Sequence, residues 1–98
     1  MELSIEAKRG ESPQAVVLPD GWVEDVQHHL RGTRFEGLVS RLDPYATARY
    51  GDVELSLLRD GLDLYVTKSQ RFVAVTREVQ QTLELAGQQQ RIVYFVGD

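Results

Sequence analysis

With 98 residues, of which 42% are hydrophobic, the chain is predicted to form a single compact domain over residues 1–98. Its net charge of −4 at pH 7 disfavours nucleic-acid binding, which depends largely on positive charge. A sequence without cysteine excludes disulfides and thiolate metal sites, and the N-terminus lacks the apolar run of a signal peptide or membrane span, so we expect a cytoplasmic protein that does not bind membranes.

The N-terminal segment alternates apolar and polar residues, which predicts a half-buried strand near residues 2–8. Gly10 to Pro13 has the composition of a turn, and the apolar residues 16–18 are a candidate hairpin partner. Pro19 is expected to end that partner strand because proline lacks a backbone donor.

A helix is predicted near residues 21–31. Asp20 is a suitable N-cap, and Gly32 is suited to the position after the last turn. The apolar residues of this segment lie on one helical stripe that includes Trp22, so Trp22 is interpreted as a core anchor rather than a recognition residue.

The next segment, residues 33–42, is predicted to be a strand with a bulge at Gly37, because a bulge lets Phe35, Leu38 and Leu42 share one face. The alternative is a helix that continues through Leu42. Asp43 and Pro44 then predict a turn, or the cap of a short helix over 44–50.

Two turn signals predict an antiparallel β-meander over about residues 45–76. Gly51-Asp52 and Asp60-Gly61 both suit two-residue hairpin turns, and a loop over 68–71 leads to a further strand. The expected strands are about 45–50, 53–58, 62–67 and 72–76. The resulting register places a common set of apolar residues in the core: Leu55, Leu57, Leu64, Val66 and Val75.

The strand at 72–76 has a helical alternative, since apolar residues also recur at helical spacing after a candidate N-cap at Ser69. The β-branched residues of 72–76 favour the strand, and the helix formers that follow predict a helix near 77–86. An unbroken apolar strand near 91–96 is expected to lie centrally in the sheet or to be covered on both faces. The predicted fold class is therefore α+β: the meander, additional strands near 2–8, 33–42 and 91–96, and helices near 21–31 and 77–86.

Chemical motifs are sparse. His28 and His29 each follow an acidic residue by four positions, but adjacent histidines point about 100° apart on a helix and do not converge on one ion. Ser40 does not lie in a nucleophile elbow, and the glycines form no phosphate-binding loop. Enzyme activity has little direct support, and we expect no cofactor and no metal.

The meander register also gathers a mixture of aromatic, aliphatic and charged residues on the face opposite the apolar one, and such mixtures are typical of binding surfaces. The candidate partner-binding residues are Tyr45, Arg49, Leu58, Tyr65 and Phe72. The alternative is that these residues form a second core layer or a solvated face. The expected function is a non-enzymatic interaction or regulatory module that binds a protein partner or self-associates. The alternatives are a ligand-binding or enzymatic domain with a pocket between sheet and helices, and a single-stranded nucleic-acid binder.

Overall fold

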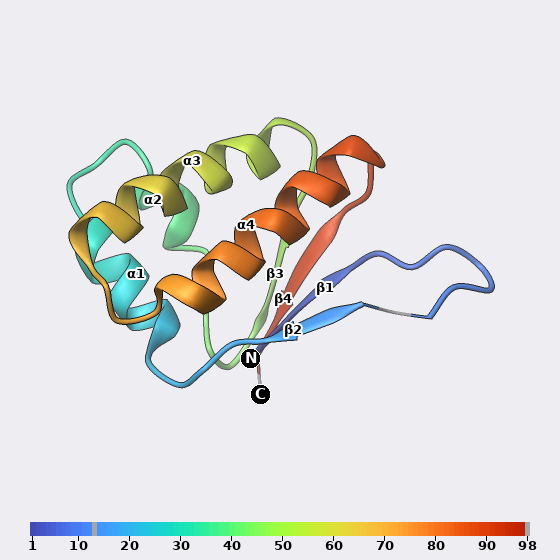
Figure 1. Ribbon diagram of the computed structural model, residues 1–98, viewed down its shortest axis with the longest axis horizontal. Coiled ribbons are helices and arrows are strands. Elements are labelled where there is room, and N and C mark those ends of the chain that lie inside the picture. Colours follow the sequence, from blue (N-terminus) through green and yellow to red (C-terminus); the bar gives the residue numbers. More distant parts are fainter. Residues whose placement is uncertain (13, 98) are drawn as a thin grey trace.

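A four-stranded antiparallel sheet and four helices make up the fold (Figure 1). The computed structural model describes residues 1–12 and 14–97. The elements, in chain order, are β1 (Glu2–Ile5), β2 (Ala15–Val17), α1 (Trp22–Leu30), α2 (Glu36–Val39), β3 (Thr47–Tyr50), α3 (Val53–Lys68), α4 (Val73–Gln88) and β4 (Val93–Val96). The predicted α+β class with an antiparallel sheet is confirmed.

The strand order is β2-β1-β4-β3, so the first and last strands of the described chain are neighbours at the centre of the sheet. The strands predicted at both ends of the sequence are confirmed, as is the hairpin of β1 with β2 and the central place of β4. β1 is shorter than predicted, because the chain after Ile5 leaves the sheet as a long arm that projects from the body (Figure 1). Pro13, the last residue of the predicted turn, lies outside the described residues.

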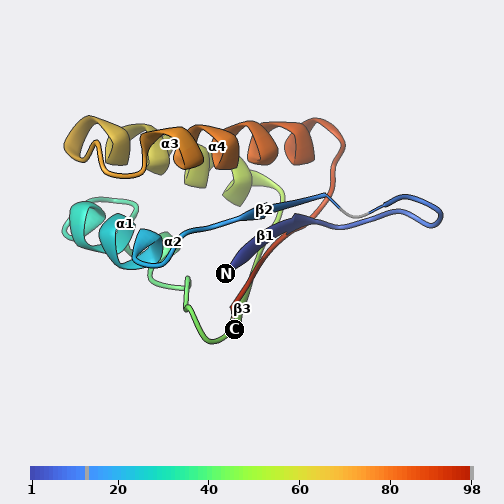
Figure 2. The ribbon, with the colours of Figure 1, turned by 60° about the horizontal axis from the view of Figure 1, so that its bottom comes forward.

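One face of the sheet packs against the helices, and Figure 2 shows α3 and α4 lying over that face. Alternate strand residues point toward the helices and are buried: Leu3, Ile5, Ala48, Tyr50, Val93 and Phe95. Trp22 at the start of α1 is fully buried, stacks on Phe95 with ring centroids 6.1 Å apart, and donates from Nε1 to the Thr76 hydroxyl oxygen at 3.0 Å. Its predicted role as a core anchor is confirmed.

The predicted helix near 21–31 is confirmed as α1, but its N-cap is not Asp20. Gly21 caps the helix with φ of 89°, a left-handed conformation that glycine adopts at little cost, and the Trp22 N–H donates to the Pro19 carbonyl oxygen at 3.2 Å. Gly32 follows the helix with φ of 78°, as expected for a terminating glycine.

The strand predicted over 33–42 is wrong, because this segment forms the short helix α2 and flanking turns. Phe35 and Val39 are four residues apart and both buried, which is helical spacing, and Gly37 lies inside α2 rather than at a bulge. The turn predicted at Asp43 is confirmed, since its carboxylate accepts from the Tyr45 N–H at 2.8 Å. The chain then enters β3 rather than the alternative helix over 44–50.

The meander predicted over 45–76 is also wrong. Only its first strand exists, as β3, and the next two strands are replaced by α3. The turn expected at Gly51-Asp52 is present, with a φ of 52° at Asp52, but it leads from strand to helix. Buried residues in α3 recur every three or four positions and form one helical stripe: Leu55, Leu58, Leu62, Tyr65 and Val66.

The Asp60-Gly61 pair, expected to be a hairpin turn, lies in the middle of α3. Gly61 is buried against the Phe35 ring, and a Cβ added to it would lie 3.0 Å from the Phe35 Cγ. The glycine therefore allows α3 to approach Phe35 closely, which is a packing requirement rather than a turn requirement.

α4 extends over both the segment 72–76, which was predicted to be a strand, and the helix predicted over 77–86. The helical alternative described this segment better, although Ser69 ends α3 instead of capping α4. Of the five predicted core residues, Leu55 and Val66 are buried, Leu64 and Val75 are partly buried, and Leu57 is 40% exposed.

Candidate functional site

The five predicted partner-binding residues do not share one surface. Leu58 and Tyr65 are fully buried in α3, and Phe72 is partly buried at the start of α4. Tyr45, which is 83% exposed, precedes β3, and Arg49 is exposed on that strand. Their predicted placement on one face of a sheet is wrong, because residues 53–68 form a helix in place of two strands.

Tyr65 instead belongs to a partly buried polar cluster that joins α1 to α3. Its hydroxyl donates to the Asp25 carboxylate at 2.5 Å, and the Ser69 hydroxyl donates to the same oxygen at 2.8 Å. Burial raises the pKa of Asp25, but these two donors and the nearby His29 and Arg71 outweigh it, so the pKa of Asp25 lies below its usual value. Burial, together with the Asp25 carboxylate, raises the pKa of Tyr65.

The histidines have structural neighbours rather than the surroundings of a metal site. His29 Nδ1 lies 2.9 Å from the Asp25 carbonyl oxygen, and its ring packs edge-on against Tyr65, while His28 is exposed. Among the described residues, no three His, Cys, Asp or Glu side chains are grouped so that they could hold a metal ion.

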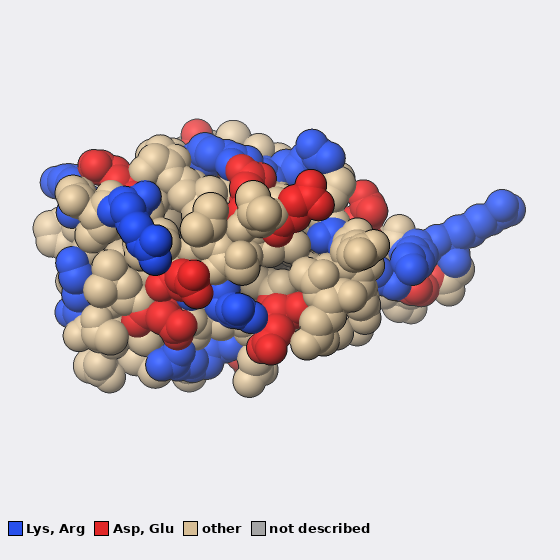
Figure 3. Space-filling view, turned by 90° about the horizontal axis from the view of Figure 1, so that it is seen from above, with Lys and Arg blue, Asp and Glu red and all other residues tan. Residues whose placement is uncertain are grey.

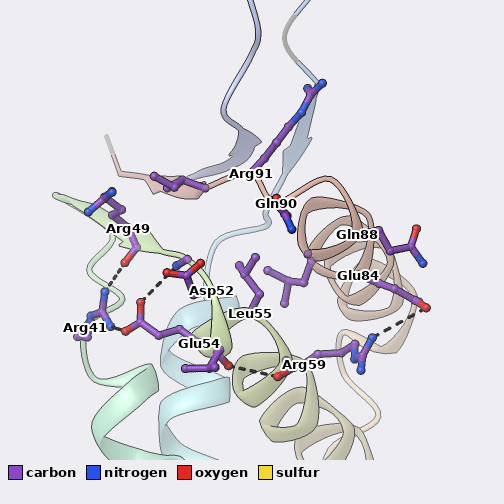
Figure 4. A pocket seen from close by; sticks show the side chains of 16 residues that line it. Arg41, Arg49, Asp52, Glu54, Leu55, Arg59, Glu84, Gln88, Gln90 and Arg91 are labelled. Carbon is purple, nitrogen blue, oxygen red and sulfur yellow. Dashed lines mark hydrogen bonds and ion pairs between the residues drawn. The ribbon is translucent and has the colours of Figure 1, made fainter.

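A cleft of about 980 Å³ opens where the edge of the sheet at β3 meets the start of α3 and the end of α4 (Figure 4). Several charged side chains line it, and most of them are paired. Arg41 contacts Glu54 and the Arg49 carbonyl oxygen, and its guanidinium lies over the Tyr50 ring. Arg59 lies 3.9 Å from Glu84.

Glu54 illustrates how this pairing neutralises charged groups of the cleft. Burial raises the pKa of Glu54, whereas hydrogen bonds from Arg41 and the Gly51 N–H lower it, and the net pKa lies below the usual value. Arg91, at the far wall, forms a two-point pair with Glu11 of the arm at 2.6 and 2.9 Å. The cleft thus offers volume and hydrogen-bonding groups rather than a concentrated charge.

The second candidate surface is the face of the sheet turned away from the helices, here called the open face (Figure 2). In the described part of the chain no helix lies beneath it. The strand registers place its residues in two rows that run from β2 to β3: Val17, Glu2, Val96 and Thr47 in one, and Ala15, Ser4, Tyr94 and Arg49 in the other.

Apolar side chains occupy the open face at positions that are unusual for a solvated sheet. Val17 is 70% exposed and Val96 is 41% exposed. Tyr94, on β4 between β1 and β3, is partly buried. The surface seen in Figure 3 has a different character, because acidic and basic side chains alternate across it and basic ones reach to the end of the arm.

Sequence reasoning missed the open face, although one signal for it was present. The unbroken apolar run at 91–96 correctly indicated a central strand, but an apolar run does not tell whether one or both faces are covered. The sequence alone therefore did not identify Tyr94 and Val96 as candidate binding residues.

No helix of the described residues is both long and apolar enough to cross a membrane. The chain matches no known family model, no curated protein and no solved structure.

Proposed function

We propose that this chain is a non-enzymatic interaction module that binds a protein partner through the open face of its sheet. The observation that carries the proposal is the exposure of Val17 and Val96 on a sheet face that no described helix covers. Val17 and Val96 lie in the same row of the open face, on either side of Glu2, and exposed apolar groups gathered on one face among polar residues are typical of interaction sites.

The composition of the open face fits a protein partner. Its apolar residues include Tyr94 on β4, an aromatic type enriched at interfaces. Two charged residues share the face: Glu2 lies between Val17 and Val96 in one row, and Arg49 lies on the edge strand β3. Since the whole chain is net negative, a protein surface fits this face better than a nucleic-acid backbone does.

The test compares exposed valines and leucines on and off the open face. Val17→Lys and Val96→Lys place a charge at its apolar positions, and Val53→Lys and Leu57→Lys place the same charge on α3, where Val53 is 72% and Leu57 40% exposed. We expect the two open-face variants to lose a partner that the wild-type chain captures from native lysate, and the two α3 variants to keep it.

All four positions are exposed, so each variant should change the free energy of unfolding by only about 0.5 kcal/mol, which urea melts would verify. Equal capture by all four variants would refute the open face as the binding surface.

The cleft supports a second candidate function, the binding of a small polar ligand. Its volume of about 980 Å³ lies at the upper end of the usual range for ligand sites. Gly87 lies on its wall, and a Cβ added there has no atom within 4 Å, so we expect the larger side chain of Gly87→Leu to be tolerated and to fill part of the cleft.

Gly37→Leu is the matched control, since Gly37 is also helical and equally unobstructed but lies outside the cleft. With a library of small polar metabolites, we expect at least one compound to raise the melting temperature of the wild type and the Gly37→Leu variant, and not that of Gly87→Leu. A library without effect on the wild type, or with equal effect on both variants, would exclude this function.

A further inference from the structure

We infer that the partner on the open face is a second copy of this chain, related by a two-fold axis that runs along β4. The inference rests on the proposed function and adds the identity of the partner. Two features carry it: the strand order, and the opposite charges on the two strands that flank β4.

The strand order makes the open face self-complementary. β1 and β3 lie on either side of β4. When two copies pack face to face about an axis parallel to β4, the rotation exchanges left and right, so β4 faces its own copy and β1 faces β3 of the partner. Both crossings of β1 with β3 are then equivalent by symmetry.

The charges on these two strands are opposite. β1 carries Glu2 on the open face, and β3 carries Arg49 in the neighbouring row. Rows of one sheet face are about 6.6 Å apart along the strand, a distance that the long arginine and glutamate side chains span together. Face-to-face packing therefore places Arg49 of each copy above Ser4 of the other and within reach of its Glu2.

Both charged groups lack a direct partner within the described residues, although the Arg49 charge helps to lower the pKa of Glu54. Among the described residues, neither the Glu2 carboxylate nor the Arg49 guanidinium has a hydrogen bond or an ion pair, and both residues are exposed. Figure 4 shows the Arg49 side chain turned away from the interior of the cleft. An intermolecular pair would thus form without breaking an existing one.

The centre of the proposed interface is apolar. Tyr94 and Val96 lie on β4, so each would meet the corresponding region of the other copy near the axis. The residues nearest the axis are thus aromatic and aliphatic, as at the core of a typical protein interface, and the charged residues lie on the two strands beside it.

Pairing of the two copies through their β3 edges is less favourable than face-to-face packing. The Arg49 carbonyl oxygen already accepts a hydrogen bond from the Arg41 side chain. A strand edge whose backbone groups already have hydrogen-bond partners in the same chain is a poorer template for pairing with another strand.

The size of the open face sets the expected affinity. The four strands lie about 4.8 Å apart, and three of them have four residues while β2 has three. They give a face of at most about 19 by 13 Å, which is smaller than a standard stable interface. We therefore expect a concentration-dependent dimer, to be followed by sedimentation from about 1 µM to about 1 mM, the range that corresponds to weak association.

The decisive experiment is a charge exchange. Glu2→Arg and Arg49→Glu should each weaken dimerisation at least tenfold, because each places like charges across both symmetric contacts. The double variant Glu2→Arg/Arg49→Glu restores opposite charges and should return the dissociation constant to within about threefold of the wild type. Its recovery also shows that neither substitution acts by unfolding the chain.

Two exposed charges on α3 provide matched controls. Asp60→Arg and Lys68→Glu change charge by the same amounts outside the open face and should leave dimerisation unchanged. A wild type that stays monomeric up to about 1 mM, single variants that dimerise normally, or a double variant that does not recover would each overturn the two-fold dimer.

Failure of the dimer and failure of the proposed function are distinguishable. In one outcome, the wild type is monomeric and captures another protein, and Val17→Lys and Val96→Lys abolish that capture. This result would support the open face as a binding surface and would exclude only a second copy of the chain as the partner. Capture that is unaffected by those variants excludes the surface itself.

Discussion

The Asp25 carboxylate accepts hydrogen bonds from two hydroxyl groups at the end of α3, so one nearly buried side chain joins two helices. Asp25→Asn retains the shape but removes the charge that strengthens both bonds. We expect it to lower the free energy of unfolding at pH 7 by about 1–2 kcal/mol, measured by urea denaturation.

The same residue predicts a pH dependence. The pKa of Asp25 is lower in the folded chain than its ordinary value of 3.8, so the unfolded chain binds a proton more readily. The stabilisation is fully present above about pH 4 and is lost as the pH falls through the lowered folded pKa. The wild type should therefore lose more stability between pH 5 and pH 2 than Asp25→Asn does.

Asp60→Asn is the control for Asp25→Asn, because Asp60 is exposed and its side chain has no hydrogen bond among the described residues. It should follow the wild-type acid profile. Parallel profiles for Asp25→Asn and the wild type would show that the cluster does not stabilise the fold through the charge.

At the level of elements, two adjacent leucines distinguish the helix at 53–68 from the strands that were predicted for the same segment. Leu58 is fully buried and Leu57 is 40% exposed. Leu58→Ala should lower the free energy of unfolding by about 2–5 kcal/mol through loss of buried surface and the resulting cavity, and Leu57→Ala by less than about 1 kcal/mol.

A strand with the predicted register would reverse this order, because it buries Leu57 and turns Leu58 outward. The two variants are each other's control, since they make the same change one position apart. Urea melts that rank Leu57→Ala as the more damaging would contradict α3 as described here.

The sequence of α3 satisfies two periodicities at once, which explains the wrong meander. Leu55, Leu57, Leu64 and Val66 alternate as in strands, while Leu55, Leu58, Leu62 and Val66 recur as in a helix. Asp60-Gly61 then favoured the strands, because its turn chemistry is visible in the sequence. The actual reason for Gly61, contact with Phe35, depends on tertiary packing that no local pattern contains.

Elements with a single strong signal were predicted well. α1 combines an apolar stripe with a terminating glycine, and β1 and β4 have apolar patterns with no helical competitor of similar strength. α2 was missed because four residues are too few to establish a helical period.

For the whole molecule, the sequence predicted strands near both ends but not their pairing, since strand order depends on contacts between distant segments. The open face follows from that order, because it exists only when β1 and β4 join and the helices collect on one side. The candidate site could therefore not be located before the topology was known.

The central position of β4 has a consequence for the chain as it is made on the ribosome. β1 is synthesised before its neighbour β4, which follows about ninety residues later. At a translation rate of about 5–20 residues per second, roughly 5–20 seconds pass between the synthesis of Leu3 and Ile5 and that of β4, the strand that pairs with theirs. During that interval the nascent chain exposes an apolar strand edge, and a chaperone that shields extended apolar segments would protect it from aggregation.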